Sequence, residues 1–95
     1  MVVGICRIDL YLYGNSSLKG KRQILRQIIE RTKSRFNVSI AEVGDNDLWQ
    51  SAKIGFSLVG NDSRVINAKI DKIRGFIESI NTAEVYGSDW DIIHF

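Results

Sequence analysis

Apolar and polar residues follow two different periods along the chain, and the changes of period divide it into six predicted elements. Four segments alternate between apolar and polar positions, which is typical of half-buried strands: residues 2–12, 37–43, 48–59 and 83–95. Two segments repeat their apolar positions every three or four residues, which is typical of amphipathic helices: residues 17–36 and 65–79. The predicted order is therefore strand, helix, strand, strand, helix, strand.

Short turns rich in Gly, Asn, Asp and Ser separate these elements. Either Ser16 or Ser17 is expected to cap the first helix, and either Asn61 or Asp62 the second. The last strand is expected to be bulged near Gly87.

The order of the elements predicts the fold. Two right-handed crossovers around a central hairpin place both helices on one face of a four-stranded antiparallel sheet, with strand order 4-1-3-2. The sequence thus predicts an α+β ferredoxin-like sandwich, formed by residues 1–95 as a single domain. In this fold the end of the first strand, the start of the first helix and the hairpin meet at one end of the molecule. Six side chains are expected to gather there: Tyr11, Tyr13, Lys19, Lys21, Trp49 and Tyr86.

The phase of the alternation assigns side chains to the two faces of the sheet. In the first strand the even positions face the core, so Cys6 is expected to be a buried apolar residue rather than a nucleophile. In the third strand Phe56 shares the core face, whereas Lys53 and Ser57 point to the open face. An RNA-recognition-motif type of base stacking on the sheet is therefore not expected. The alternation places Trp49 at an outward position. There it either anchors a partner or folds over a neighbouring loop.

Charge is distributed unevenly along the chain. Residues 1–36 carry eight Lys or Arg against two acidic residues, a balance of +6, whereas residues 37–95 carry five basic and nine acidic residues, a balance of −4. At about 100° per residue, Lys19, Arg22, Arg26 and Lys33 fall within an arc of about 60° on the first helix. This pattern is typical either of a surface for a polyanion or of a solvated helix face.

No pattern of residues builds an active site. The loop from Gly14 to Arg22 misses the spacing of a nucleotide-binding loop and has Arg22 where Ser or Thr is needed, although it remains a candidate anion site at a helix N-terminus. His94, the only histidine, has no nucleophilic partner, and the acidic residues of the hairpin miss calcium-loop spacing. We expect no catalytic residue, no cofactor and no metal.

The same sequence gives an expected location. It has no apolar run long enough for a membrane span and no signal peptide. A single cysteine is consistent with a reducing cytoplasm.

Three segments resemble the YlxP-like family of small uncharacterised bacterial proteins: SLKGKR (residues 17–22), RFNVSIAEV (residues 35–43) and DLWQSA (residues 47–52). The resemblance spans about residues 1–80 and implies a ferredoxin-like fold. Because genes of this family often lie beside genes for translation and ribosome maturation, it also implies association with RNA or the ribosome. It implies no catalytic residues. Gly20 departs from the charged or polar residue usual at its position, which predicts a loosened helix start.

These observations favour a non-enzymatic module that binds RNA or a ribosomal particle. Five basic residues are expected to contact phosphates, with two aromatic residues for stacking or anchoring: Lys19, Lys21, Arg22, Arg26 and Lys33, with Tyr11 and Trp49. The alternative is a homodimeric protein-interaction module that uses the open sheet face or an edge strand. A third hypothesis, an enzyme acting on phosphoryl groups through the loop at Gly14, rests on near-miss spacing alone.

Overall fold

The computed structural model describes all residues from 1 to 95 and arranges them in six elements. The helices are α1 (Leu18–Arg35) and α2 (Ser63–Ile80). The strands are β1 (Val2–Tyr11), β2 (Ser39–Gly44), β3 (Ser51–Gly60) and β4 (Glu84–His94). Their order along the chain is the predicted one.

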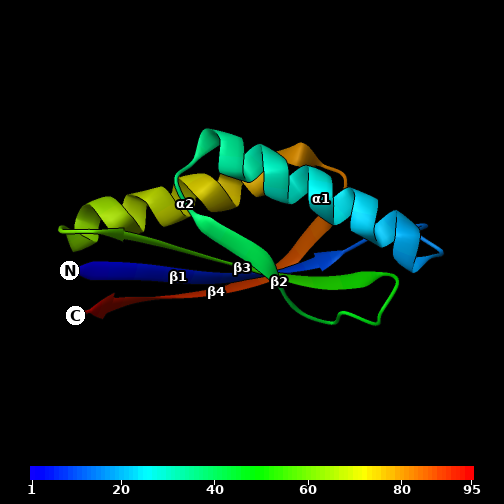
Figure 1. The fold of residues 1–95 in the computed structure, drawn as a ribbon, viewed down its shortest axis with the longest axis horizontal. Coiled ribbons are helices and arrows are strands. Elements are labelled where there is room, and N and C mark those ends of the chain that lie inside the picture. Colours follow the sequence, from blue (N-terminus) through cyan, green and yellow to red (C-terminus); the bar gives the residue numbers. More distant parts are fainter.

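The four strands form one antiparallel sheet in the order β2-β3-β1-β4, which confirms the predicted topology. Figure 1 shows both helices on one side of the sheet, so its other face is uncovered. The fold is therefore a ferredoxin-like α+β sandwich. β1 and β3 are the central strands, and β2 and β4 are the edges.

Both helices begin at the predicted caps. The side chain of Ser17 accepts a hydrogen bond of 3.0 Å from the amide of Gly20, and Asp62 accepts one of 2.9 Å from the amide of Arg64. α2 ends at Asn81, whose φ of 62° lies in the left-handed region that often closes a helix. Neither helix combines the length and apolar character that a membrane span requires.

The core lies between the helices and the inner face of the sheet. As the alternation predicts, it takes the even positions of β1 and the facing positions of β3, such as Ile8 and Ile54. α2 packs unusually close to β1 at Gly4, where a Cβ atom would lie only 2.6 Å from Cγ2 of Ile66. The absence of a side chain at this position therefore permits the close approach.

Three elements begin two or more residues away from the predicted start, and one of them is α2, which begins at Ser63 rather than at residue 65. β3 begins at Ser51 rather than at residue 48, so Trp49 lies in the loop between β2 and β3 and not in a strand. The strand β2 likewise begins two residues later than expected, at Ser39. The predicted bulge in β4 is present: Leu10 pairs with Val85 and Asp9 with Gly87, which leaves Tyr86 as the extra residue.

Candidate nucleic-acid interface

Four exposed basic residues of α1 form what we call the basic stripe: Lys19, Arg22, Arg26 and Lys33. None of the four has a side-chain nitrogen within 4.0 Å of a carboxylate oxygen, so none forms an ion pair. At 1.5 Å per residue the stripe is about 21 Å long. It is therefore a row of solvent-facing cations that form no ion pairs, with Glu30 as the acidic residue on the same side of the helix.

Two further arginines of α1 point elsewhere. The guanidinium carbons of Arg31 and Arg35 lie 5.9 and 5.1 Å from the centre of the Phe76 ring on α2. At about 100° per residue, both lie at least about 120° around the helix from Lys19. These arginines contribute to the contact between the helices, which leaves the basic stripe on a separate side of α1.

The prediction that Lys21 contacts phosphate is wrong, because this residue is only 2% exposed. Its Nζ donates hydrogen bonds to three carbonyl oxygens, those of Asp45 and Leu48 in the β2–β3 loop and that of Ser51 at the start of β3, the last two at 2.8 Å. The spacing already pointed to this: Lys21 precedes Leu25 by four residues and Ile28 by seven, which places it on the buried face of the helix. Its function in this structure is to hold the loop.

Glu42 completes the environment of this lysine. Its Oε2 lies 3.1 Å from Nζ of Lys21 but receives no hydrogen bond. The three ammonium protons are directed to the three carbonyls, so the contact with Glu42 is electrostatic. A buried cation is thereby fully partnered, and the loop of residues 45–50 is tied to the first turn of α1.

A second tie joins the same loop to the helix start. The side-chain amide of Asn15 donates to the carbonyl of Ser17, at 2.8 Å, and to the carbonyl of Trp49. A Cβ atom at Gly20 would lie 2.3 Å from Oδ1 of Asn15. Gly20 thus makes room for the asparagine that holds the loop. Sequence reasoning did not single out Asn15.

The aromatic residues expected at this end of the molecule do gather there. The rings of Tyr11 and Tyr13 meet edge to face with centroids 4.5 Å apart. The hydroxyl of Tyr11 donates to Gln50 at 3.3 Å, and Trp49 lies with Tyr11 around a shallow hollow. Trp49 is 53% exposed, but from a loop rather than from the strand whose alternation predicted its outward position. Figure 1 shows this loop near the start of α1, where the basic stripe begins.

The other tyrosines are held to neighbouring strands. The hydroxyl of Tyr13 donates to a carboxylate oxygen of Glu84 on β4, and this hydrogen bond raises the pKa of Tyr13. The hydroxyl of Tyr86 lies 3.5 Å from that of Ser51. These contacts fasten the first residues of β4 to the same end.

An ion cluster lies on the open face of the sheet. Oδ1 of Asp9 lies 3.1 Å from Nε of Arg7 and 3.0 Å from Nζ of Lys53. Burial of Asp9 acts to raise its pKa, but the hydrogen bonds from Lys53 and Arg7 outweigh that effect, so the pKa lies below its usual value. The same contact raises the pKa of Lys53. These cations are therefore neutralised within the chain, unlike the basic stripe.

Cys6 is buried, as predicted. Burial raises the pKa of its thiol to about 11, despite the opposing field of Arg74. Because the nucleophile is the thiolate, this cysteine is inert in the folded protein.

Comparison with known proteins gives a family and a fold. A family model described as "Protein of unknown function (DUF503)" matches residues 3–90. The chain is 31% identical over 83 residues to the uncharacterized protein YlxP of Bacillus subtilis (strain 168), covering 87% of this chain and 90% of that protein.

Among solved structures, the de novo designed protein Foldit4 matches with a TM-score of 0.58 at 16% identity, over 99% of this chain and 97% of that one. The SecDF periplasmic domain P4 matches with a TM-score of 0.44 at 14% identity, over 96% and 88%. At 16% identity the match to Foldit4 concerns the fold alone.

Proposed function

We propose that this chain, which belongs to the DUF503 family of proteins of unknown function, is a non-enzymatic module that binds RNA. The RNA is either free or part of a ribosomal particle. The phosphates of the RNA contact the basic stripe of α1. The exposed side chain of Trp49, with Tyr11 beside it, offers an unpaired base a stacking surface next to the stripe.

One observation supports this proposal above the others: the difference between the cations of the basic stripe and those of the sheet. Arg7 and Lys53 are paired with Asp9, and Lys21 is buried among carbonyl oxygens. Every basic residue of the stripe is exposed and without a carboxylate partner. Like charges aligned on one helix repel one another, and a polyanion relieves that repulsion while releasing its own counterions.

The arrangement also supports a defined docking position rather than diffuse attraction. The stripe follows a helix, which is rigid, and the loop that carries Trp49 is held to the first turn of that helix by Lys21 and Asn15. Phosphate contacts and base stacking are thereby kept in a constant relation. A protein surface with fixed geometry loses less conformational entropy on binding than a flexible tail.

The experiment is a salt titration of binding to structured RNA and to small ribosomal subunits. Four phosphate contacts predict a slope of log affinity against log salt of about −3 to −4. The triple variant Arg22→Glu, Arg26→Glu, Lys33→Glu leaves Lys19 alone, so the slope is expected to fall to about −1 or binding to be lost.

A matched control keeps the change of net charge the same. The triple variant Arg64→Glu, Lys69→Glu, Lys72→Glu reverses three exposed cations of α2 instead. It is expected to retain most of the affinity and slope. Equal losses in the two variants would show attraction by net charge without a site, and undiminished binding by the α1 variant would refute the proposal.

A further inference from the structure

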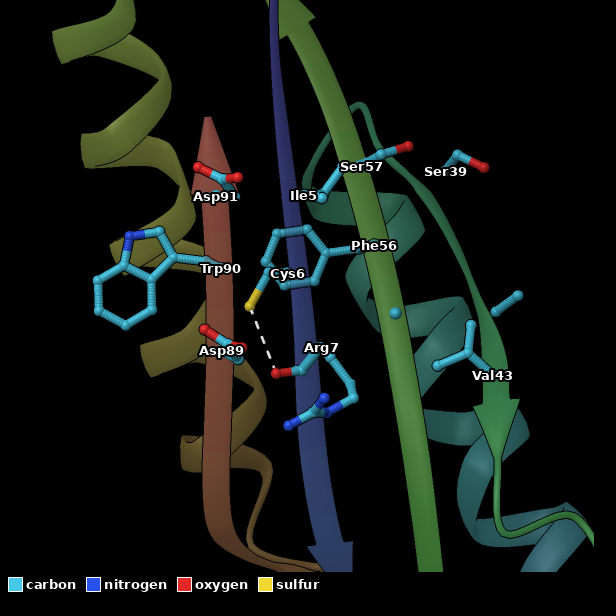
Figure 2. Close-up of a pocket in the computed structure, with 12 residues that line it drawn as sticks. Ile5, Cys6, Arg7, Ser39, Val43, Phe56, Ser57, Asp89, Trp90 and Asp91 are labelled. Carbon is cyan, nitrogen blue, oxygen red and sulfur yellow. Dashed lines mark hydrogen bonds between the residues drawn. The ribbon is translucent and has the colours of Figure 1, made fainter. Parts of the chain in front are cut away.

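The open face of the sheet has a trough of about 610 Å³ that crosses the strands. Figure 2 shows its surroundings: Ile5 and Arg7 lie on β1, Asp89 and Asp91 on β4, and Val43 on β2. Trp90, by contrast, points out beyond the edge strand, where Arg74 lies 4.6 Å from its ring. The trough is thus a surface feature of the sheet and is separate from the basic stripe.

The two halves of this face differ in side-chain size. β1 and β4 present large side chains, namely Ile5, Arg7, Asp89 and Asp91. The neighbouring strands present small residues at the same two levels of the sheet, because Ile5 pairs with Ser57 and Arg7 with Gly55. On β2 these levels hold Ser39 and Ala41. At these two levels β3 and β2 therefore carry smaller residues than β1 and β4, although the side chain of Val43 on β2 lies over Gly55.

We propose that the open face binds the same face of a second copy of this chain, about a two-fold axis that runs parallel to the strands between β1 and β3. Rotation about this axis leaves the position of each residue along the strand direction unchanged. It places β1 of one chain over β3 of the other, and β4 over β2. Ile5 then faces Ser57 of the second copy, and Arg7 faces Gly55 of the second copy. The side chains of β1 and β4 of each chain then lie over the smaller residues of β3 and β2 of the other, and the stem of Arg7 contacts Val43 beside Gly55.

Charge agrees with this arrangement. Asp9 and Lys53 lie at one level and are already paired within each chain, so the axis places ion pairs rather than like charges opposite each other. Asp91 lies at the level of Ser39, which has a hydroxyl to donate to it. The other in-plane axis, perpendicular to the strands, would oppose β4 to β4 and bring together Asp89 and Asp91 of both chains, which have no cation within 4.0 Å. The parallel axis is the one that avoids this repulsion.

Apolar residues complete the contact at one end of the face. Val3 and Val59 pair with each other across β1 and β3, and Ile93 pairs with Val3 from the other side. Val59 and Ile93 are 62% and 45% exposed in the single chain. The two-fold axis places this group against the same group of the second copy, which removes its apolar surface from water.

The size of the face sets the expected strength. Three strands of about ten residues and one of six, spaced about 4.8 Å apart with about 3.3 Å per residue, cover roughly 600 Å² per chain. Two such faces bury about 1,200 Å², the lower end of the range for specific complexes. We therefore expect a dissociation constant in the micromolar range, about 1–100 µM. Both helices lie on the outside of this dimer, so both basic stripes remain accessible.

The test is the mass of the protein in solution between about 1 and 500 µM, by sedimentation velocity and light scattering. The wild-type chain is expected to shift from monomer to dimer across this range. The variant Ala41→Asp places a carboxylate opposite Asp89 of the second copy, twice per dimer, and is expected to weaken dimerisation at least about tenfold. The matched control, Ala68→Asp on the exposed surface of α2, is expected to dimerise like the wild type.

A charge exchange tests the axis itself. In the double variant Ala41→Asp, Asp89→Lys the two changed residues attract across the proposed interface, so dimerisation is expected to return. Within one chain they lie on opposite edge strands, three strand spacings or about 14 Å apart, so the rescue cannot arise inside a monomer. A chain that stays monomeric at 500 µM, or a dimer insensitive to Ala41→Asp, or an absence of rescue would each overturn the proposal.

Discussion

Replacing Lys21 with methionine tests whether a buried lysine determines the conformation of the loop that carries Trp49. Methionine keeps the length and apolar stem of the side chain but removes the ammonium group. Three carbonyl oxygens each lose one donor, with that of Asp45 keeping the N–H of Leu48, and the carboxylate of Glu42 is left half-buried without its cation. The change therefore leaves the hydrogen bonds of Asn15, which precedes α1, as the remaining polar link between the helix start and the loop.

The expected magnitude follows from the exposure of the groups that are left. Removing one partner of a buried ion pair costs about 3–5 kcal/mol. Leu48 is exposed and the side chain of Glu42 is 25% exposed, so water can reach some of the groups that lose the ammonium. The expected loss of unfolding free energy is therefore at the lower end of this range, about 3 kcal/mol. For a domain of this size, that is a decrease in Tm of about 12–24 °C.

The assay is urea unfolding, together with amide exchange at Leu48, whose N–H donates to the carbonyl of Asp45 at 3.0 Å. Lys19→Met is the matched control, because Lys19 is exposed two residues away, and its effect should stay within about 0.5 kcal/mol. The double variant Lys21→Met, Glu42→Leu removes the orphaned charge and should recover about 1 kcal/mol or more. If Lys21→Met is as mild as Lys19→Met, the loop is held by something else and the reasoning fails.

Two further predictions concern titratable groups. Because the pKa of Asp9 is lowered by folding, its ionised form stabilises the protein above the unfolded pKa of about 3.9, and this contribution is lost as the pH falls through the folded pKa. Urea unfolding should therefore show Asp9→Asn less stable than the wild type near pH 6 and equally stable near pH 2, and a difference that persists at pH 2 would contradict the assignment. With a thiol pKa of about 11, Cys6 is thiolate in about one molecule in a thousand at pH 8, so thiol reagents should modify it only as fast as the protein unfolds. Rapid, stoichiometric labelling of the native protein would show that it is accessible.

The elements and their arrangement were predictable because each rests on a local pattern. The alternation through Cys6, Ile8 and Leu10 fixed which face of β1 is buried, and the three- and four-residue spacing of α1 fixed its inner face. Ser17 and Asp62 were among the named candidates for the caps. With these elements in this order, chain connectivity and the handedness of crossovers leave one simple sheet topology.

The loop between β2 and β3 was not predictable in the same way. The alternating pattern predicted that the third strand begins at residue 48. Leu48 falls at an inward position of that pattern and Trp49 at an outward one. In the folded chain Lys21, more than twenty residues earlier, takes the carbonyls of Asp45 and Leu48, so the backbone there bonds to a side chain rather than to a neighbouring strand. A hydrogen bond of this kind depends on distance in space, which local sequence patterns do not encode.

The sequence by itself determined which residues form helices and strands, which faces of them are apolar, and that the first half of the chain carries an excess of positive charge. Only the tertiary structure decided which of those charges remain available, because ion pairing and burial depend on what packs alongside. It assigned Lys21 to the loop, Arg7 and Lys53 to Asp9, and Arg31 and Arg35 to Phe76. The basic stripe is what remains, since no element packs over that side of α1 to neutralise or bury its charges.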